Sequence, residues 1–431
     1  MKKKSLRITV MAVAICVILG TWAAAFAKAE TEKAGTAAQA AATIQTDAVS
    51  AGASVVAVST GTAIFQRSDL FTDRDLLQIA DLSKAVTYTV ADGQDIAITA
   101  AGTYVLTGSA RNVTVTVEAD KEDKVQLVLE GLDLTNDDAP AIYVKSADKV
   151  FVTTATDSAL SVTGSFVKDG DTNLDGVIFS KSDLTLNGTG TLTVASSKNG
   201  VVGKDDLKVT GGTYVISANK KALEANDSIR IADGVLELTA GTDGLHAEND
   251  ENDTTGYIYI GGGTVAIRCG DDAIHATSVV QVDGGDLTIS AAEGIEATYV
   301  QLNGGTVSIT SSDDGINAAQ KSSAYRATVE IYGGDIAIVM GAGDTDGVDS
   351  NGDIIVNGGT ISVSGNSTFD YDGTAQYTGG TILANGQQID YIPNQMMGGG
   401  MGGWGGFGGG WGGNGGFGGG NGGFGGGRRG W

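Results

Sequence analysis

The sequence predicts an all-β protein whose body is a single-stranded, right-handed parallel β-helix with coils of about 20 to 29 residues. Three features predict this fold. A short string that opens on Gly-Gly or Asp-Gly recurs along the chain, two further strand patterns follow each copy in a fixed order, and the 431 residues contain only 2 Pro, which would interrupt a strand ladder. The handedness follows from the preference of parallel connections for a right-handed crossover. The recurring strings are GGTYVIS at 211, DGVLELT at 233, GGTVAIR at 262, GGDLTIS at 284, GGTVSIT at 304, GGDIAIV at 333 and GGTISVS at 358.

The first strand of each coil alternates apolar and polar residues, so one of its sides faces a core. A second strand (LEA, LHA, IHA, IEA, INA, VDS) and a third (IRI, IYI, VQV, VQL, VEI, IIV) complete each coil. Three short strands in about 22 residues predict a β-helix, because a propeller blade needs about 40 residues or more. The expected inward columns of the first strand are Tyr214, Leu236, Val265, Leu287, Val307, Ile336 and Ile361, then Ile216, Leu238, Ile267, Ile289, Ile309, Ile338 and Val363.

The chain divides into five expected segments. Basic residues, an apolar run over 8–19 and small residues up to Ala27 predict an export signal, with an uncleaved membrane anchor as the alternative. A repeat array must cover the end of its core, so we assign the amphipathic stretch 68–80 to a short capping helix. The segments are a signal peptide at 1–27, a flexible leader at 28–62, an N-terminal cap segment at 63–84, the β-helix at 85–390 and a Gly-rich low-complexity tail at 391–431.

Charge and cysteine usage narrow the class of protein. The formal net charge is −24 at pH 7, which argues against nucleic acid and in favour of cations as partners. The export signal predicts a secreted, extracellular protein, either free or held at the cell surface. Cys16 leaves with the signal, so Cys269 remains alone and no internal disulfide can form. Its place in an inward column with Ala240 and Ala291 predicts a small core residue rather than a reactive thiol.

Two polar columns accompany the second strands. One stands at the start of each strand (Asp175, Asn199, Lys221, Asp243, Asp272, Glu293, Asp314, Asp346) and the other three residues later, facing outward (Glu224, His246, His275, Glu296, Asn317, Asp349). Stacking places equivalent carboxylates about 5 Å apart, which requires a bridging cation, raised pKa values or side chains splayed into water. Oxygen donors suit Ca²⁺, so we expect a calcium-binding face, with a merely solvated acidic face as the alternative. The candidate ligands are Asp243, Asp271, Asp272, Glu293, Glu296, Asp313, Asp314, Asn317, Asp344, Asp346 and Asp349.

Two further motifs are open to more than one interpretation. His246 and His275, the only 2 histidines, share the outward column. They fit a transition-metal pair or an acid–base couple, but we favour a simple ladder of polar residues because no Cys or third His supports them. The loop at 169–176 has the D-x-N-x-D-G spacing of a calcium loop, but Ser182 stands where a bidentate acid is expected, so an ordinary inter-coil loop fits equally well.

The sequence also resembles a family of secreted bacterial carbohydrate-binding β-helix proteins. The resemblance rests on ITAAGTYVLTG at 98, VQLVLEGLDLT at 125, AIYVKSADKVFVT at 141, VIFSKSDLTLNGTGTLTV at 177, GVVGKDDLKVTGGTY at 200 and the DGI-type second strands. It covers about 85–390 and implies binding of plant-cell-wall polysaccharides, both cellulose-like and pectic, with bound calcium, on a fold similar to calcium-dependent pectate lyases. Asn199 and Lys221 replace acids in the first half of the column, which puts cation sites there in doubt.

These features favour a secreted, calcium-dependent, non-catalytic polysaccharide-binding protein. The insertions at 248–256 and 319–327 occupy the same corner of their coils and would wall a groove. A calcium-dependent lyase is the first alternative, with Lys220 or Lys221 as the base, and a cell-surface adhesin or scaffold is the second. A basic strip of Lys220, Lys221 and Arg230 could attract an acidic glycan without calcium. We find no convincing nucleophile triad.

Overall fold

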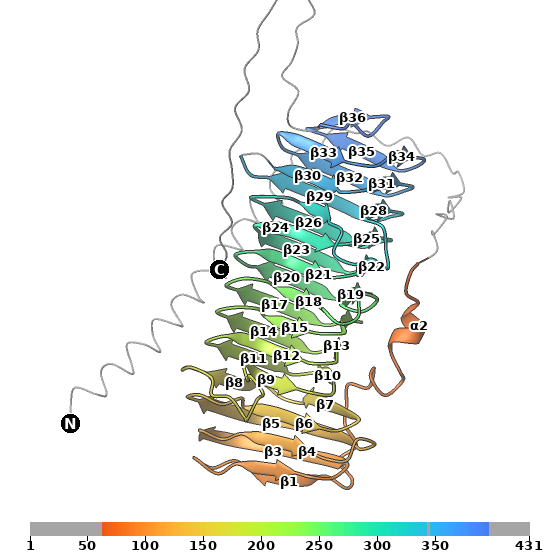
Figure 1. Ribbon diagram of the computed structural model, residues 1–431. Helices are drawn as coiled ribbons and strands as arrows, with labels where there is room; N and C mark the ends of the chain where they lie inside the picture. The colour runs from red at the N-terminus through yellow and green to blue at the C-terminus, as the bar shows by residue number, and fades with distance from the viewer. Residues whose placement is uncertain (1–62, 343–344, 396–431) are drawn as a thin grey trace, which may run out of the picture. The chain divides into compact units, whose positions relative to one another are not determined.

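The computed structural model describes residues 63–342 and 345–395 of the chain. Within them, parallel strands follow one another from β1 (Val86–Thr89) to β35 (Thr381–Ala384) and form a stack of coils, and β36 (Gln387–Ile389) follows them (Figure 1). The strands belong to one sheet of 24 and one of 12. The molecule is therefore all-β with a β-helix-like architecture. The expected signal peptide, the leader and the tail beyond 395 lie outside the described residues. No helix in the described ranges is long and apolar enough to cross a membrane.

Each coil from β7 onward contributes one strand to each of three parallel ladders, in the order that the repeat predicted. The first-strand ladder contains β8 (Ser158–Val162), β11 (Thr191–Ser196), β14 (Thr213–Ala218), β17 (Val235–Ala240), β20 (Thr264–Arg268), β23 (Asp286–Ala291), β26 (Thr306–Ser311), β29 (Asp335–Met340), β32 (Thr360–Ser364) and β35 (Thr381–Ala384). The second-strand ladder contains β2 (Ile96–Ile98), β4 (Val115–Glu118), β6 (Ile142–Ser146), β9 (Gly176–Ser180), β12 (Asn199–Gly203), β15 (Leu223–Ala225), β18 (Leu245–Ala247), β21 (Asp272–Ala276), β24 (Glu293–Ala297), β27 (Ile316–Ala318), β30 (Asp346–Ser350) and β33 (Ser367–Tyr371). The third-strand ladder contains β1, β7 (Lys149–Thr154), β10 (Asp183–Gly188), β13 (Asp206–Val209), β16 (Ser228–Ile231), β19 (Tyr257–Ile260), β22 (Val279–Val282), β25 (Tyr299–Leu302), β28 (Thr328–Ile331), β31 (Asp353–Val356) and β34 (Ala375–Tyr377).

The first and third ladders merge near the N-terminal end of the stack. There β3 (Gly102–Arg111) and β5 (Lys124–Asn136) are long enough to belong to both, and β5 pairs with β7 through its first half and with β8 through its second. The register partners of the second ladder lie 19 residues apart at Ile96 and Val115, and 36 apart at Ile142 and Ile178. The coil length therefore varies more than the sequence repeat predicted, because loops of different length leave the same ladder.

The two inward columns of the first strand stack as expected. Leu236 pairs with Val265, which pairs with Leu287, and all three are almost fully buried. The outward residues between them, such as Glu237 and Thr288, are exposed. Each aliphatic residue is thereby shielded by the coils above and below it as well as by the opposite ladders, which is how a narrow repeat array builds a continuous core.

Cys269 is a free cysteine that packs, partly buried, against this core. Burial raises the pKa of its thiol to about 12, so the thiolate that reacts with electrophiles is scarce at neutral pH.

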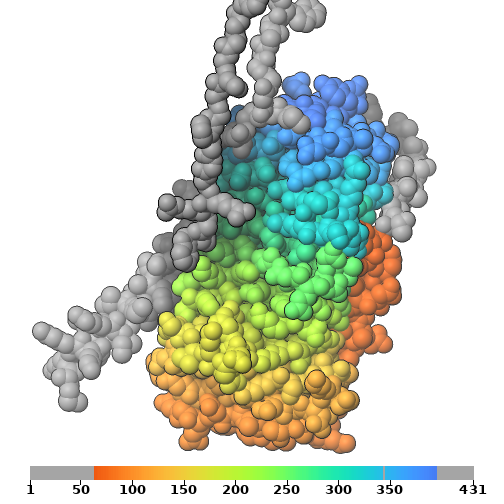
Figure 2. All heavy atoms as spheres, viewed as in Figure 1, coloured from red at the N-terminus to blue at the C-terminus, as the bar shows by residue number. Residues whose placement is uncertain are grey.

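The N-terminal segment does not cap the stack, contrary to the expectation from its amphipathic pattern. Its helix, α2 (Arg67–Leu70), has four residues, and the segment at 63–78, here called the flanking segment, lies against the third-strand ladder beside the stack (Figures 1 and 2). The N–H of Phe65 donates to Oε1 of Gln281 at 2.7 Å, and Gln78 donates to the carbonyl of Thr210 at 2.9 Å. The apolar residues that suggested a capping helix serve this lateral contact instead, since Leu70 and Phe71 pack with Tyr257 and Tyr259.

A buried ion cluster fixes the flanking segment to the stack. Asp75 is fully buried, and its carboxylate lies 3.1 Å from Nζ of Lys149 and 3.3 Å from Nζ of Lys208. Burial alone would raise the pKa of Asp75, but the Thr72 N–H and the two ammonium groups hold it well below its usual range. Two strands of the third ladder, β7 and β13, therefore depend on a carboxylate that comes from outside the repeat.

The last described strand differs from all the others. β36 folds back and pairs antiparallel with β35, with Ile389 opposite Ile382. The remaining pairs of named strands in the described ranges are parallel.

Candidate functional site

The second-strand ladder carries the two polar columns in the register that the repeat predicted. Glu224, His246, His275, Glu296, Asn317 and Asp349 are successive cross-strand partners, and the column continues to Asp370 on β33. The residues at the start of each strand are joined through their backbones. For example, the carbonyl of Asp314 accepts from the N–H of Gly294, and that of Asp346 accepts from the N–H of Gly315. We call this surface, from Asn199 to Asp370, the polar face.

Glycine follows most residues of the first column because two coils approach closely there. A Cβ at Gly294 would lie 2.2 Å from the carbonyl oxygen of Gly315, and a Cβ at Gly315 would lie 2.4 Å from that of Gly347. Real side chains do not tolerate such contacts. The Asp-Gly and Glu-Gly pairs in the sequence thus combine a polar side chain with a backbone that fits against the next coil.

The first part of the polar face neutralises its own charge. Glu224 accepts a hydrogen bond from Nδ2 of Asn199 at 2.7 Å and lies 3.3 Å from Nζ of Lys204 and 4.0 Å from Nζ of Lys221. The substitutions of acid by Asn199 and Lys221 therefore place an amide and a cation against the Glu224 carboxylate. A calcium ion would find the Glu224 carboxylate already neutralised there.

The middle of the polar face is built around two stacked imidazoles. The rings of His246 and His275 lie 4.5 Å apart between centroids at 19°. Nδ1 of His246 lies 2.9 Å from Asp243, and Nδ1 of His275 lies 2.6 Å from Asp272.

His275 also contacts the next acid of the outward column. Its Nδ1 lies 3.0 Å from Glu296, which in turn lies 3.1 Å from Nζ of Lys321. Although burial alone would lower the pKa of His275, Asp272 and Glu296 raise it to about 9. The imidazolium and Lys321 hold the pKa of Glu296 well below its usual value against the effect of burial.

The last part of the polar face holds carboxylates that repel one another. Burial and the charges of Glu296 and Asp272 raise the pKa of Glu293 to about 8. Burial also raises the pKa of Asp314 to about 6 and that of Asp349 to about 7, and the neighbouring charges that add to both shifts are carboxylates. Nδ2 of Asn317 lies 3.5 Å from Glu293. These acids are kept from full solvation without the cationic partners that the first two parts of the face possess.

The predicted ligands therefore fall into three groups. Glu293, Asp314, Asn317, Asp346 and Asp349 lie together in the last part of the face. Asp243, Asp272 and Glu296 pair with the histidines. Asp271 and Asp313 are exposed residues just before the columns, and Asp344 lies outside the described residues.

Sequence reasoning missed Asp370. It is the register partner of Asp349, and its charge contributes to the raised pKa of that residue. The signal that could have found it is the step from Val348 to Phe369, two apolar residues in the same inward column, each followed directly by an aspartate.

The two insertions meet at one corner of the stack. Oγ of Ser322, in the 319–327 insertion, donates to the carbonyl of Asp253, in the 248–256 insertion, at 2.6 Å, and the N–H of Ser323 donates to the Asp253 carboxylate at 3.0 Å. A cavity of about 450 Å³ lies beside the 248–256 insertion and is lined by Lys204, Lys221, Glu224, Ala225, Asn226, Asp227, His246, Glu248, Asn249, Asp250 and Glu251. The expected wall is thus one continuous structure, and a polar cavity opens at its foot.

Two of the three acids in the loop with calcium-loop spacing have cationic partners. Asp169 lies 3.0 Å from Nζ of Lys145 and accepts from the hydroxyl of Tyr143 at 3.1 Å, and Asp175 lies 3.7 Å from Nζ of Lys198. These pairs favour the interpretation as an ordinary inter-coil loop.

Comparison with known proteins places the chain in a family. The sequence profile of the "Carbohydrate-binding domain-containing protein" family matches residues 92–342. A protein of that description from Acetivibrio thermocellus is 36% identical over 124 residues, which is 28% of this chain and 43% of the relative, so the match spans less than half of the relative's length. A solved chain described as "Structure of the polysaccharide lyase-like protein from C. thermocellum, Gadolinium derivative" is 27% identical, with a TM-score of 0.45 over 60% of this chain and 96% of that chain. Because the profile covers more than half of the sequence, the chain belongs to the family of carbohydrate-binding domain-containing proteins.

Proposed function

We propose that this protein is secreted and binds acidic plant-cell-wall polysaccharide, with pectic polygalacturonate in first place, through Ca²⁺ and without cleaving it. Membership of a carbohydrate-binding family gives the partner class, a polysaccharide. The observation that carries the finer proposal is the ladder of partly buried carboxylates at the end of the polar face, whose pKa values are raised by burial and by one another. A divalent cation relieves that repulsion, and carboxylate and amide oxygens are the donors that Ca²⁺ prefers.

The proposed calcium ligands lie on or just before four consecutive strands of the second ladder, β24, β27, β30 and β33. They are Glu293, Asp314, Asn317, Asp346, Asp349 and the adjoining Asp370. Ca²⁺ accepts six to eight oxygens in irregular geometry, so an ion bound on an open face keeps positions for water or for a ligand. A uronate carboxylate that replaces water there is joined to the protein through the ion. This explains how a chain of net charge −24 could attract an anionic glycan.

Affinity electrophoresis in gels containing polygalacturonate, with Ca²⁺ or with excess chelator, tests the proposal. We expect calcium-dependent retardation of the parent and its loss in the double variant Asp314→Asn, Asp349→Asn. The matched control is Asp271→Asn, Asp313→Asn, which removes the same charge from the exposed positions next to the columns. An equal loss of retardation in both double variants, or retardation that does not change when chelator is added, would reject calcium bridging. A pull-down on insoluble cellulose with the same variants separates the cellulose-like ligand from the pectic one.

Stronger retardation of the Asn variants than of the parent would instead show that the glycan is attracted to a basic strip on the protein without calcium. The strip expected from the sequence is smaller than predicted, because Arg230 pairs with Asp206 at 2.6 Å on the third ladder. Lys220 and Lys221 remain, and Lys221 already lies beside Glu224.

The lyase alternative needs a base next to the calcium. Lys221 stands four ladder steps from Asp314, roughly 19 Å at the usual strand spacing, which is too far to act on one sugar. Lys321 is closer, since its Nζ lies 3.1 Å from Glu296, but it is held there as a counter-charge. An unsaturated, ultraviolet-absorbing product formed from polygalacturonate by the parent and lost in Lys321→Met would overturn the non-catalytic proposal.

A further inference from the structure

Each imidazole of the polar face has a carboxylate beside its Nδ1, and this nitrogen is hydrogen-bonded to Asp272 in His275 but has no hydrogen-bond partner in His246. In each case Nδ1 lies within 2.9 Å of the carboxylate three residues earlier in the chain, Asp243 for His246 and Asp272 for His275. The rings stack at 19°, and because each Nδ1 lies at the carboxylate three residues earlier, the two Nε2 atoms lie on the same side. A carboxylate on one ring nitrogen is the arrangement that orients histidine for metal binding through the other nitrogen and increases its basicity as a ligand.

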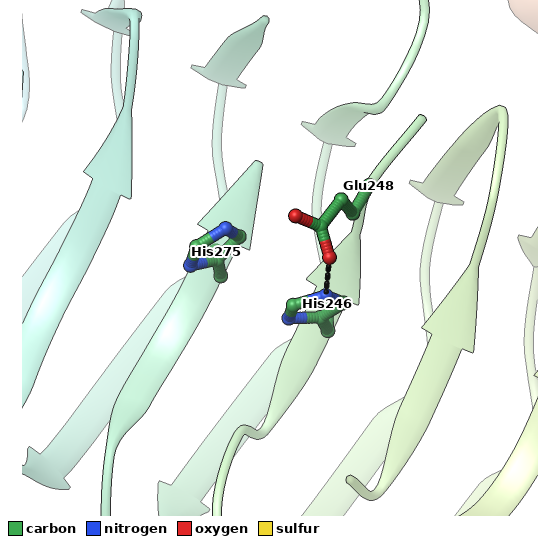
Figure 3. A group of neighbouring side chains, drawn as sticks. All are labelled: His246, Glu248 and His275. Carbon is green, nitrogen blue, oxygen red and sulfur yellow. Dashed lines mark hydrogen bonds and ion pairs between the residues drawn. The ribbon is translucent and has the colours of Figure 1, made fainter. Parts of the chain in front are cut away.

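A third donor faces the same side. Oε2 of Glu248 lies 3.0 Å from Nε2 of His246 (Figure 3). One ligand atom from each of His246, Glu248 and His275 can be chosen so that all three lie within 4.8 Å of one another. The histidines come from neighbouring strands, β18 and β21, and Glu248 begins the 248–256 insertion directly after β18. Two rigid strands thus fix the nitrogens, while the loop supplies an oxygen that is half exposed.

We propose that His246, Glu248 and His275 bind a late first-row transition-metal ion, with Zn²⁺ as the ion expected in a secreted protein. Two imidazole nitrogens and one carboxylate oxygen are a ligand set that zinc uses when it keeps its fourth position open. Ca²⁺ is the wrong ion here because it takes oxygen ligands, so this site is separate from the proposed calcium ladder and does not depend on it. The proposal departs from the expectation that the histidines form only a polar ladder.

Metal binding displaces the Nε2 proton of the His275 imidazolium and requires a small movement of the rings. Zinc–nitrogen bonds are about 2.0 to 2.1 Å long, so two nitrogens bound to one ion lie closer together than the 4.5 Å that separates the centroids of the stacked rings. The rings tilt toward the ion while each Nδ1 stays on its carboxylate. The open position then faces the cavity that His246 and Glu248 line together with Lys204 and Lys221. Water or an anionic oxygen of a bound ligand completes the coordination.

Calorimetric titration of ZnCl₂ into the mature chain, without a polyhistidine tag and with saturating Ca²⁺ present, tests the proposal. We expect one Zn²⁺ per chain and at least tenfold weaker binding in His246→Asn and in His275→Asn. Glu224→Gln is the matched control, because Glu224 is the cross-strand partner of His246 and lines the same cavity but is not a proposed ligand. Unchanged zinc affinity in both histidine variants, an equal loss in the control, or full displacement of Zn²⁺ by Ca²⁺ would each overturn the site.

Glu248→Gln keeps the test decisive if a buried histidine variant fails to fold, since Glu248 lies at the start of an exposed loop. Co²⁺ bound at a tetrahedral site absorbs strongly in the visible region, so the parent should show this spectrum and Glu248→Gln should weaken or lose it. Melting curves of both chains report whether the fold is intact. A parent without the visible spectrum, or a variant with an unaltered one, would reject the proposed ligand set.

Discussion

Without calcium, the protein should lose stability as the pH rises from about 5 to 8.5. Glu293 has a usual pKa of 4.5 and one of about 8 in the folded chain, and Asp349 shifts from 3.8 to about 7. A carboxyl group whose pKa is raised by folding binds its proton more tightly in the folded state than in the unfolded state. Its contribution to stability is therefore complete below the unfolded pKa and is lost as the pH rises through the folded pKa.

The size of the loss follows from these values. One pKa unit corresponds to 1.36 kcal/mol, so ionising Glu293 in the folded chain costs about 5 kcal/mol and ionising Asp349 about 4 kcal/mol. The two costs overlap, because both include repulsion by carboxylates of the same ladder. We therefore expect a total loss of about 5 kcal/mol, which is large beside a typical folding free energy of about 5 to 15 kcal/mol.

Melting temperatures measured in chelator at pH 5.5, 7 and 8.5, and again with millimolar Ca²⁺, check this reasoning. Calcium binds the ionised carboxylates, so it should stabilise the protein most at pH 8.5, by about 2.7 kcal/mol when its concentration is a hundred times the dissociation constant. His275, with a pKa raised to about 9, titrates in the same direction, so Asp349→Asn is needed to isolate the ladder. A melting temperature in chelator that stays constant or rises with pH would show that the ladder carboxylates are fully solvated.

Three further results are expected. Ile289→Asp should unfold the stack, because it buries an unpaired charge in the inner column. Thr288→Asp, one residue away on the outer surface, should leave the circular dichroism spectrum and the melting curve unchanged. Two soluble variants with the same melting curve would mean that the inward register is wrong. Asp75→Ala should lower the free energy of unfolding by about 3 to 5 kcal/mol in denaturant titrations, because it removes the carboxylate that pairs with Lys208 and leaves Lys149 only the more distant Asp183, at 3.6 Å. Asp69→Ala on the exposed side of α2 should have little effect. A thiol reagent at pH 7 should modify Cys269 slowly in the native chain and quickly in denaturant, and equal rates would contradict its burial.

The repeat made the core and the polar face predictable from the sequence. Once the Gly-Gly strings are aligned, Leu236, Val265 and Leu287 must share a column, because in-register stacking is the way in which a repeated strand buries the same side each time. The alignment that places these residues also places Glu224, His246 and His275 on the outward side. The register of both columns was therefore contained in the spacing alone.

Features outside the repeat were not predictable in the same way. The flanking segment occurs once, so no periodicity shows that Asp75 meets Lys149 and Lys208, which are 74 and 133 residues away. The division of the polar face into three parts was not predictable from the sequence for a related reason. Sequence spacing aligns Asp272 and Glu293 as equivalent acids, but only the three-dimensional contacts show that the first has an imidazole partner and that the second is held among carboxylates.

The antiparallel strand β36 determines where the array stops. A parallel stack of near-identical coils ends on a row of unpaired backbone donors and acceptors, which is a template for the first coil of another molecule. At the C-terminal end, β36 occupies part of that row on β35 and runs in the wrong direction to be continued by a further coil. This pairing blocks end-to-end polymerisation through the C-terminal end of the first ladder. A chain shortened before Gln387 would expose the unpaired backbone groups of β35 to other molecules. The last described strand thus covers the end of the first ladder by reversing the direction that the strands before it share.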